Sequence, residues 1–159
     1  MINRHARILN LAPIHHPALP PADGIKPTGF TDEYTLEMSA FQSLSKIRPL
    51  SIWPGILARV CEGREMTFAV AELDGGAVAA RHQHPNEQLG MVIEGSVDFE
   101  IGGERRILNP GDTYVISSNV PHEAVAGPEG CVLIDVFAPT RIDWHRHEPQ
   151  PPEPPKWPQ

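Results

Sequence analysis

From Ser51 onward the chain is a succession of short segments rich in β-favouring residues and separated by glycine-containing turns. In residues 97–101, VDFEI, apolar and acidic side chains alternate, so the apolar ones share one face of a strand. Gly102 and Gly103 follow at once and indicate a two-residue hairpin turn. Helical periodicity is confined to a short stretch before Ser51. The pattern predicts an all-β sandwich or barrel.

Both ends of the chain are rich in proline, which removes backbone donors and fixes φ. The length of 159 residues suits a single domain. We expect a proline-rich N-terminal extension with a short helix at residues 1–45, and a β-barrel at residues 46–147. We expect a proline-rich tail at residues 148–159, in a polyproline II conformation, either exposed or packed against a neighbouring surface.

Charge and hydropathy exclude some classes of binding partner and indicate a cellular compartment. A net charge of −7 without any basic stretch argues against nucleic acid. No apolar run is long enough to span a membrane, and the N-terminus lacks the apolar core of a secretory signal, so we expect a cytoplasmic protein. Cys61 and Cys131 lie in strand-like apolar segments, and we interpret them as buried structural thiols in a reducing compartment.

The residues with the clearest chemistry are histidines. His82 and His84 are two residues apart, so on a strand both imidazoles leave the same face. Gln88 offers an amide oxygen after a Pro-Asn turn, and His122 stands among turn residues much later in the chain. Three imidazoles and one oxygen suit a divalent metal ion with positions left for water or substrate. Glu87 competes as the oxygen ligand, but on a continuing strand it points to the opposite face, so we favour Gln88.

A second group of polar residues lies at the end of the last apolar strand, residues 131–138. Asp135 is costly there unless it is paired, bound to metal or functional. It either pairs with a barrel arginine such as Arg59, or faces a cavity where burial raises its pKa and suits it to proton transfer. Arg141 follows six residues later, and its planar guanidinium is suited to binding a carboxylate at two points.

On these residues the chain resembles the cupin superfamily, whose first motif is a glycine, a His-x-His pair, a glutamate and a second glycine at fixed spacing. The matching positions are Gly76, His82, His84 and Gly95, with Gln88 in place of the glutamate. The second motif is matched by Gly111 and His122, whereas Ser117, Asn119 and Ala126 replace its proline, glycine and asparagine. The resemblance implies a single-domain double-stranded β-barrel of the jelly-roll type.

Within that superfamily, residues 51–144 resemble the small single-domain metal cupins of the KdgF type, which linearise unsaturated uronates to 5-keto-4-deoxyuronate. The shared segments are H-x-H-P-x-E-Q and L-I-D-V-F-x-P-x-R. The resemblance implies that a divalent ion (Zn, Ni, Fe or Mn) is held by His82, His84, Gln88 and His122. It also implies roles in the reaction for three residues: acid/base for Asp135, pocket shape for Phe137 and carboxylate binding for Arg141.

We therefore expect a metal-dependent enzyme of isomerase or lyase type that opens or tautomerises the ring of a small anionic sugar derivative. The resemblance implies a homodimer as well. Two alternatives remain open: another metal-cupin enzyme, such as a dioxygenase or a different lyase, and a non-catalytic cupin that binds a small molecule. Nothing in the sequence resembles an attached DNA-binding domain, which weakens a regulatory role.

Overall fold

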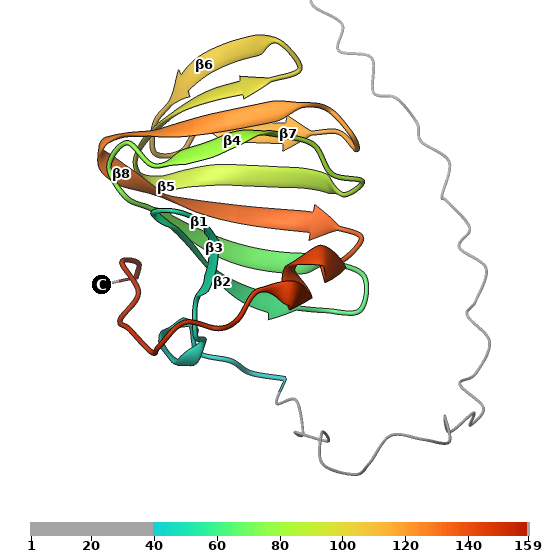
Figure 1. Cartoon of the computed structure of the whole chain (residues 1–159), viewed down its shortest axis with the longest axis vertical. Helices are drawn as coiled ribbons and strands as arrows, with labels where there is room; N and C mark the ends of the chain where they lie inside the picture. The colour runs from blue at the N-terminus through green and yellow to red at the C-terminus, as the bar shows by residue number, and fades with distance from the viewer. Residues whose placement is uncertain (1–39, 159) are drawn as a thin grey trace, which may run out of the picture. The chain divides into compact units, whose positions relative to one another are not determined.

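The computed structural model describes residues 40–158, which form a β-barrel and a proline-rich tail (Figure 1). Most of the extension expected at residues 1–45, including most of its helix, lies outside the described residues. The described end of that extension carries a single 3-10 turn, η1 (Leu44–Lys46). None of the helices in residues 40–158 has the length and hydrophobicity needed to cross a membrane.

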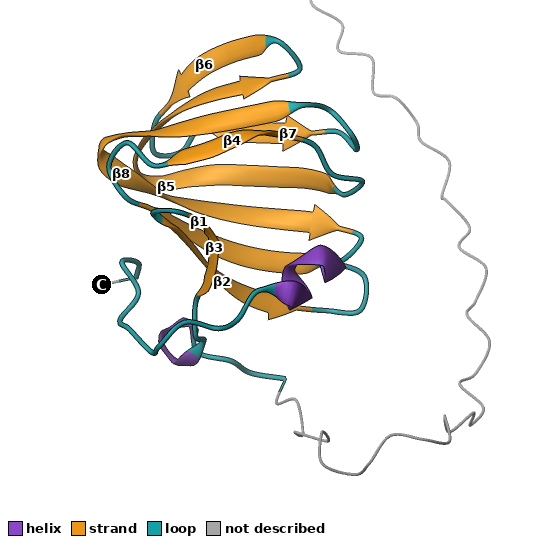
Figure 2. Ribbon diagram, in the orientation of Figure 1, coloured by secondary structure: helices purple, strands orange, loops and turns teal. Residues whose placement is uncertain are grey.

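Eight strands form one antiparallel sheet that curves around a common interior (Figure 2). They are β1 (Leu50–Trp53), β2 (Ile56–Glu62), β3 (Thr67–Leu73), β4 (Val78–His82), β5 (Glu87–Ile101), β6 (Glu104–Leu108), β7 (Thr113–Ile116) and β8 (His122–Ala138). Neighbouring strands follow the order β1-β2-β3-β8-β5-β6, with β4 paired to β8 and β7 paired to β5. A short helix, η2 (Ile142–Arg146), follows β8. The all-β barrel expected from the sequence is confirmed.

The long strand β5 shows how the barrel bends. Its first half pairs with β7 and its second half with β6, while β8 runs along both. The register shifts between Gly95 and Val97, and such a bulge bends a strand without removing it from the sheet. Gly95 has a φ of 72°, and a side chain there would overlap the backbone of Gly130. Gly95 therefore marks a bend inside one strand and not a turn between two strands.

The apolar side chains that alternate in residues 97–101 point into the barrel, as predicted. Val97 and Phe99 are buried in the core, at 0% and 6% exposure, and Gly102 and Gly103 form the tight turn to β6. Cys131 is buried too, and burial raises the pKa of its thiol to about 12, in agreement with a structural role. Cys61 is only half-buried.

The proline-rich tail packs against the barrel of its own chain. Arg59 on β2 is 1% exposed and pairs with Glu72 on β3 at 3.3 Å. Its guanidinium also donates to the carbonyl oxygens of Ile47 (2.6 Å) and Glu153 (2.9 Å). Glu72 accepts a further hydrogen bond from the backbone N–H of Lys156 at 3.0 Å. A buried ion pair thus attaches both the segment before β1 and the tail to the sheet.

Candidate metal centre and active site

The three predicted histidine ligands come together at one end of the barrel. His82 ends β4 and His122 begins β8, and these two residues are direct partners in the β4–β8 pairing. His84 follows in the loop after β4 and is buried. Their ligand atoms all lie within 4.8 Å of one another, close enough to share one metal ion. Strand pairing therefore joins residues that are about forty positions apart.

A backbone carbonyl holds each of the three imidazoles at Nδ1. A carbonyl oxygen can only accept a hydrogen bond, so Nδ1 carries the proton and Nε2 keeps its lone pair. Metal-binding histidines are commonly oriented by such a contact. The three contacts are His82 with Ala80 (2.7 Å), His84 with Asn86 (2.9 Å) and His122 with Val120 (2.8 Å).

Burial keeps these imidazoles neutral. Desolvation lowers the pKa of His82 and of His84, and it lowers the pKa of His122 to about 4. A neutral imidazole is the form that binds a metal ion. The cluster is therefore ready to bind a cation near pH 7.

Gln88, near the start of β5, supplies an oxygen beside this cluster. Its Oε1 lies 3.1 Å from Nε2 of His84, and its Nε2 donates a 2.7 Å hydrogen bond to Oδ1 of Asp135. The acceptor on Asp135 fixes the amide orientation and turns Oε1 toward the histidines. Since Nδ1 of His84 already holds the proton, two lone pairs face each other, and a cation bound by both atoms would satisfy both. Glu87 is exposed, as expected for the opposite face. The donor set fits a divalent ion with nitrogen and oxygen ligands.

Asp135 lies on the inner face of β8 in the same pocket, 5% exposed. Its Oδ1 accepts hydrogen bonds from Gln88 and from the hydroxyl of Tyr114, the latter at 2.6 Å. Burial raises the pKa of this carboxyl to about 6, although both hydrogen bonds oppose the shift. The alternative ion pair with Arg59 is not formed, because Arg59 pairs with Glu72 instead. Sequence reasoning did not single out Tyr114, since only strand register reveals its proximity to Asp135.

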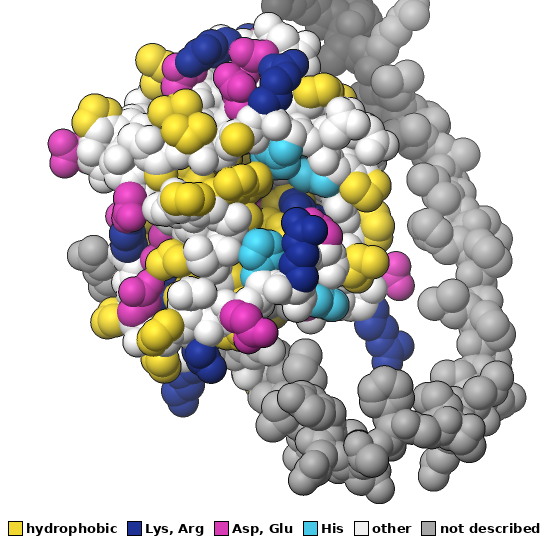
Figure 3. Space-filling view, in the orientation of Figure 1, with side chains coloured by type: hydrophobic (Ala, Val, Ile, Leu, Met, Phe, Trp, Pro, Cys, Tyr) yellow, Lys and Arg dark blue, Asp and Glu magenta, His cyan; other side chains and the backbone are white. Residues whose placement is uncertain are grey.

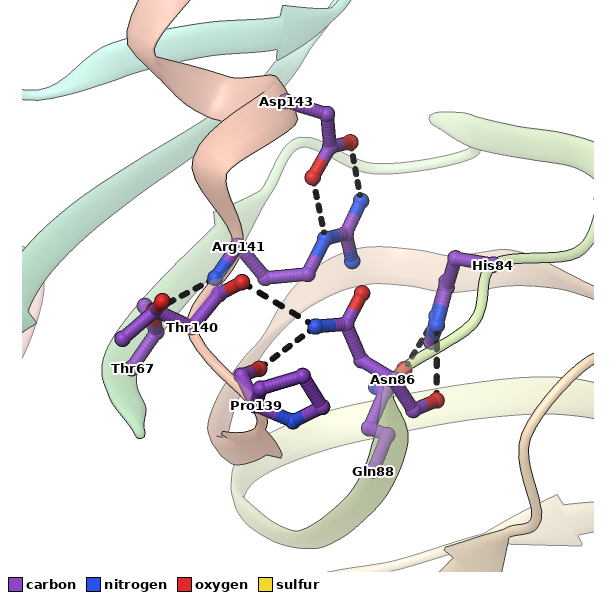
Figure 4. Close-up of polar contacts among 8 residues, drawn as sticks. All are labelled: Thr67, His84, Asn86, Gln88, Pro139, Thr140, Arg141 and Asp143. Atoms are coloured by element: carbon purple, nitrogen blue, oxygen red, sulfur yellow. Dashed lines mark hydrogen bonds and ion pairs between the residues drawn. The ribbon is translucent and has the colours of Figure 1, made fainter. Parts of the chain in front are cut away.

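Arg141 and Phe137 form a stacked wall of the pocket. The guanidinium lies over the rings of Phe137 (4.8 Å) and Trp144 (4.4 Å). Its Nε and Nη2 donate to the carboxylate of Asp143 at 3.0 and 2.9 Å, as Figure 4 shows. The predicted partner of this guanidinium was a substrate carboxylate, yet Asp143 already occupies one edge. Nη1 makes no hydrogen bond with the described residues and is not sealed from solvent, so it is open to a ligand.

Asn86 connects the histidine cluster to the wall formed by Arg141 and Phe137. Its side-chain amide is buried and donates to the carbonyl oxygens of Pro139 and Thr140, directly before Arg141 (Figure 4). Its own carbonyl accepts from His84. One turn residue therefore contacts both the histidine loop and the chain segment that leads to Arg141.

The pocket combines these polar groups with an apolar wall. Histidine and basic side chains gather at a hollow of the face shown in Figure 3. Trp53 lies beside His82, with ring centroids 4.7 Å apart. The remaining wall is mainly apolar and includes Ile52, Phe99, Leu133, Phe137 and Trp144. Such a lining suits a small molecule with a few polar anchors.

Comparison with known proteins agrees with this geometry. Residues 69–137 match the Cupin domain family. The pectin degradation protein KdgF of Dickeya dadantii is 43% identical over 98 residues, which cover 61% of this chain and 81% of that protein. The chain belongs to the cupin superfamily.

Two solved structures are similar to this chain in fold. KdgF from a Halomonas species is 34% identical, with a TM-score of 0.57 over 60% of this chain and 88% of that one. An RmlC-like cupin from Shewanella frigidimarina is 28% identical, with a TM-score of 0.62 over 66% of this chain and 95% of that one. Within the superfamily the chain is therefore similar to the KdgF proteins.

Proposed function

We propose that the protein is a metal-dependent cupin enzyme that opens and tautomerises the ring of a small anionic sugar derivative. Its substrate would be an unsaturated uronate, converted to a 5-keto-4-deoxyuronate. The observation that carries this proposal is the buried Asp135, hydrogen-bonded to Gln88 in the pocket of the histidine cluster. The similarity to a pectin degradation protein supports the substrate class.

The reaction needs no added atoms, only the movement of a proton. The hemiacetal opens when the bond between the ring oxygen and the anomeric carbon breaks and the anomeric hydroxyl loses its proton. The ring oxygen becomes the oxygen of an enol, and the neighbouring alkene carbon gains a proton as the ketone forms. Asp135 would move the proton, and a carboxyl whose pKa lies at about 6 can serve as acid or base near neutral pH.

The other pocket residues would bind and orient the substrate. The open edge of Arg141 can hold the uronate carboxylate, and Phe137 keeps that guanidinium in place by stacking. A divalent ion at His82, His84, Gln88 and His122 would supply Lewis acidity toward a hydroxyl or carbonyl oxygen. The apolar wall would exclude water from the proton-transfer step.

The test is turnover of an unsaturated monouronate by metal-loaded protein. Loss of the ultraviolet absorbance of the conjugated double bond is compared with the spontaneous rate. We expect acceleration that a chelator removes, and that Asp135→Asn reduces by about 10²–10⁴-fold while the metal is retained. Substantial activity in Asp135→Asn would contradict its role. No acceleration by the metal-loaded protein would remove the uronate assignment, and activity with redox-inert zinc would exclude a dioxygenase.

A further inference from the structure

Three residues lie in one row across the middle of the sheet. Gly90 on β5 pairs with Tyr114 on β7 at one side and with Asp135 on β8 at the other. Paired strands lie about 4.8 Å apart, so the Tyr114 and Asp135 backbones are separated by roughly 10 Å. The phenol hydroxyl nevertheless reaches Oδ1 of Asp135 at 2.6 Å. The tyrosine ring therefore crosses the strand between them.

Gly90 is what allows this crossing. A Cβ atom at position 90 would overlap Cζ, Cε2 and the hydroxyl oxygen of Tyr114. Both Tyr114 and Asp135 are buried, at 6% and 5% exposure, so the ring has little room to move aside. The missing side chain at position 90 thus creates the path by which the hydroxyl reaches the carboxylate.

The two oxygens of Asp135 have different surroundings. Oδ1 accepts from both Gln88 and Tyr114. Oδ2 accepts no hydrogen bond from the described residues. Every side-chain polar atom of these residues that is sealed from solvent has a hydrogen-bond partner, so the unpaired Oδ2 is not sealed from solvent. Oδ2 consequently opens into the pocket that Asp135 lines. Two donors on one oxygen fix the carboxylate plane and present the other oxygen to the pocket.

We propose that Tyr114, admitted across the sheet by Gly90, is a positioning residue that holds Asp135 with Oδ2 as the proton-transferring atom. The inference rests on the proposed function, because it takes Asp135 as the acid/base. Without Tyr114, Gln88 would be the only hydrogen-bond donor to Asp135 among the described residues. A carboxylate with one donor can rotate, and a misplacement of about 1 Å can cost about a hundredfold in rate.

The first test needs no substrate. Crystal structures of the full chain are compared for the unmodified protein, Tyr114→Phe and Gly90→Ala. We expect Asp135 to turn or to occupy more than one orientation in Tyr114→Phe, and the phenol to be displaced from Asp135 in Gly90→Ala. An Asp135 carboxylate that keeps the same single orientation in Tyr114→Phe overturns the proposal. This result stands even if Gly90→Ala fails to fold.

The second test separates positioning from stability. In Tyr114→Phe we expect kcat to fall about tenfold to a hundredfold, with KM within about twofold and bound metal unchanged. Val97→Ala is the matched control, because Val97 is fully buried but lies outside the pocket. It should lower Tm and leave kcat unchanged. If Tyr114→Phe, like Val97→Ala, lowers Tm and leaves kcat unchanged, then Tyr114 has only a structural role and the proposal is wrong.

The two proposals can fail separately. If the unmodified metal-loaded protein does not turn over the uronate, the proposed function fails and the crystal structures alone decide the role of Tyr114. If turnover is seen, the double variant Gly90→Ala/Tyr114→Phe adds a further check. Because Gly90 acts through Tyr114, the double variant should lose no more kcat than the worse single variant. Multiplied losses would show that Gly90 acts by another route.

Discussion

Asn86 shows how much of this site depends on a single buried amide. Its side-chain NH2 group donates to two consecutive carbonyl oxygens in the turn after β8, while its backbone oxygen orients His84. The substitution of Asn86 therefore affects the histidine loop and the arginine wall together. Neighbouring Pro85 marks a turn in the sequence, but nothing local indicates the partner of that turn.

We predict that Asn86→Ala weakens zinc binding by about 10–100-fold, since residues that orient metal ligands usually have effects of this size. It should also lower the free energy of unfolding by about 1–3 kcal/mol, because the Pro139 and Thr140 carbonyls lose their donor. Zinc affinity is measured by competition with a chelator, and stability by urea denaturation. Asn109→Ala, at an exposed position, is the control and should change neither. Unchanged zinc affinity in Asn86→Ala would contradict the coupling.

At the scale of elements, the short helix η2 carries the residues that hold Arg141. Asp143 binds one edge of the guanidinium and Trp144 stacks on its face. The hydrogen bond from Arg141 lowers the pKa of the Asp143 carboxyl. A depressed folded-state pKa means that this pair stabilises the fold above the unfolded pKa and loses that contribution as pH falls through the folded value.

We predict that Asp143→Asn destabilises the protein at pH 7 by no more than about 1 kcal/mol, because Asp143 is partly exposed and solvent screens the pair. The difference from the unmodified protein should disappear at a pH below the folded pKa of Asp143, where both chains lack the charge. Urea denaturation at pH 7 and at successively lower pH values measures it. Glu129→Gln removes an equal charge from an exposed position and is the control, which should leave stability at pH 7 unchanged. A difference that persists at low pH would contradict this account.

The same elements show what sequence can and cannot predict. The spacing of His82 and His84 was enough to predict a shared site, although His84 lies in the loop after β4 and not on a strand. Alternation along β5 itself separates Gln88 from Glu87. Asp135 was found because a carboxylate in an apolar strand needs an explanation. Tyr114 was not found, since its contact depends on the register of β7, β5 and β8, which local patterns do not encode. The Asp143 contact likewise needs the helical turn after β8.

At the scale of the whole molecule, the buried pair of Arg59 and Glu72 joins the barrel to segments on either side of it. Removing one buried charge leaves the other without its partner. We predict that Arg59→Met lowers the free energy of unfolding by about 3–5 kcal/mol, and that Arg59→Met/Glu72→Met recovers much of this loss. Urea denaturation measures both. Arg105→Met breaks an exposed pair and should change stability little. A double variant as unstable as the single one would show that charge is not the cause.

We also propose the homodimer that the resemblance implies. Apolar side chains form a row on the outer face of β3, β8, β5 and β7: Phe68, Val136, Leu89 and Val115. Phe68, Leu89 and Val115 are 37%, 48% and 58% exposed, and such a face suits contact with a second copy.

Light scattering should give twice the chain mass of 17.5 kDa, and Leu89→Lys should halve the measured mass. Ile107→Lys, exposed on β6, is the control. A monomeric mass for the unmodified protein refutes the dimer.

The position of β8 in the sheet also determines when the protein can fold during its synthesis. β3, β4 and β5 all take β8 as a partner, yet β8 is made after every other strand of residues 40–158. Until residues 122–138 leave the ribosome, these strands have unpaired edges, a state that favours aggregation. His122 begins β8, so an ion could not contact all three histidines before β8 has been made. The barrel and the histidine cluster therefore form together, once β8 has been made.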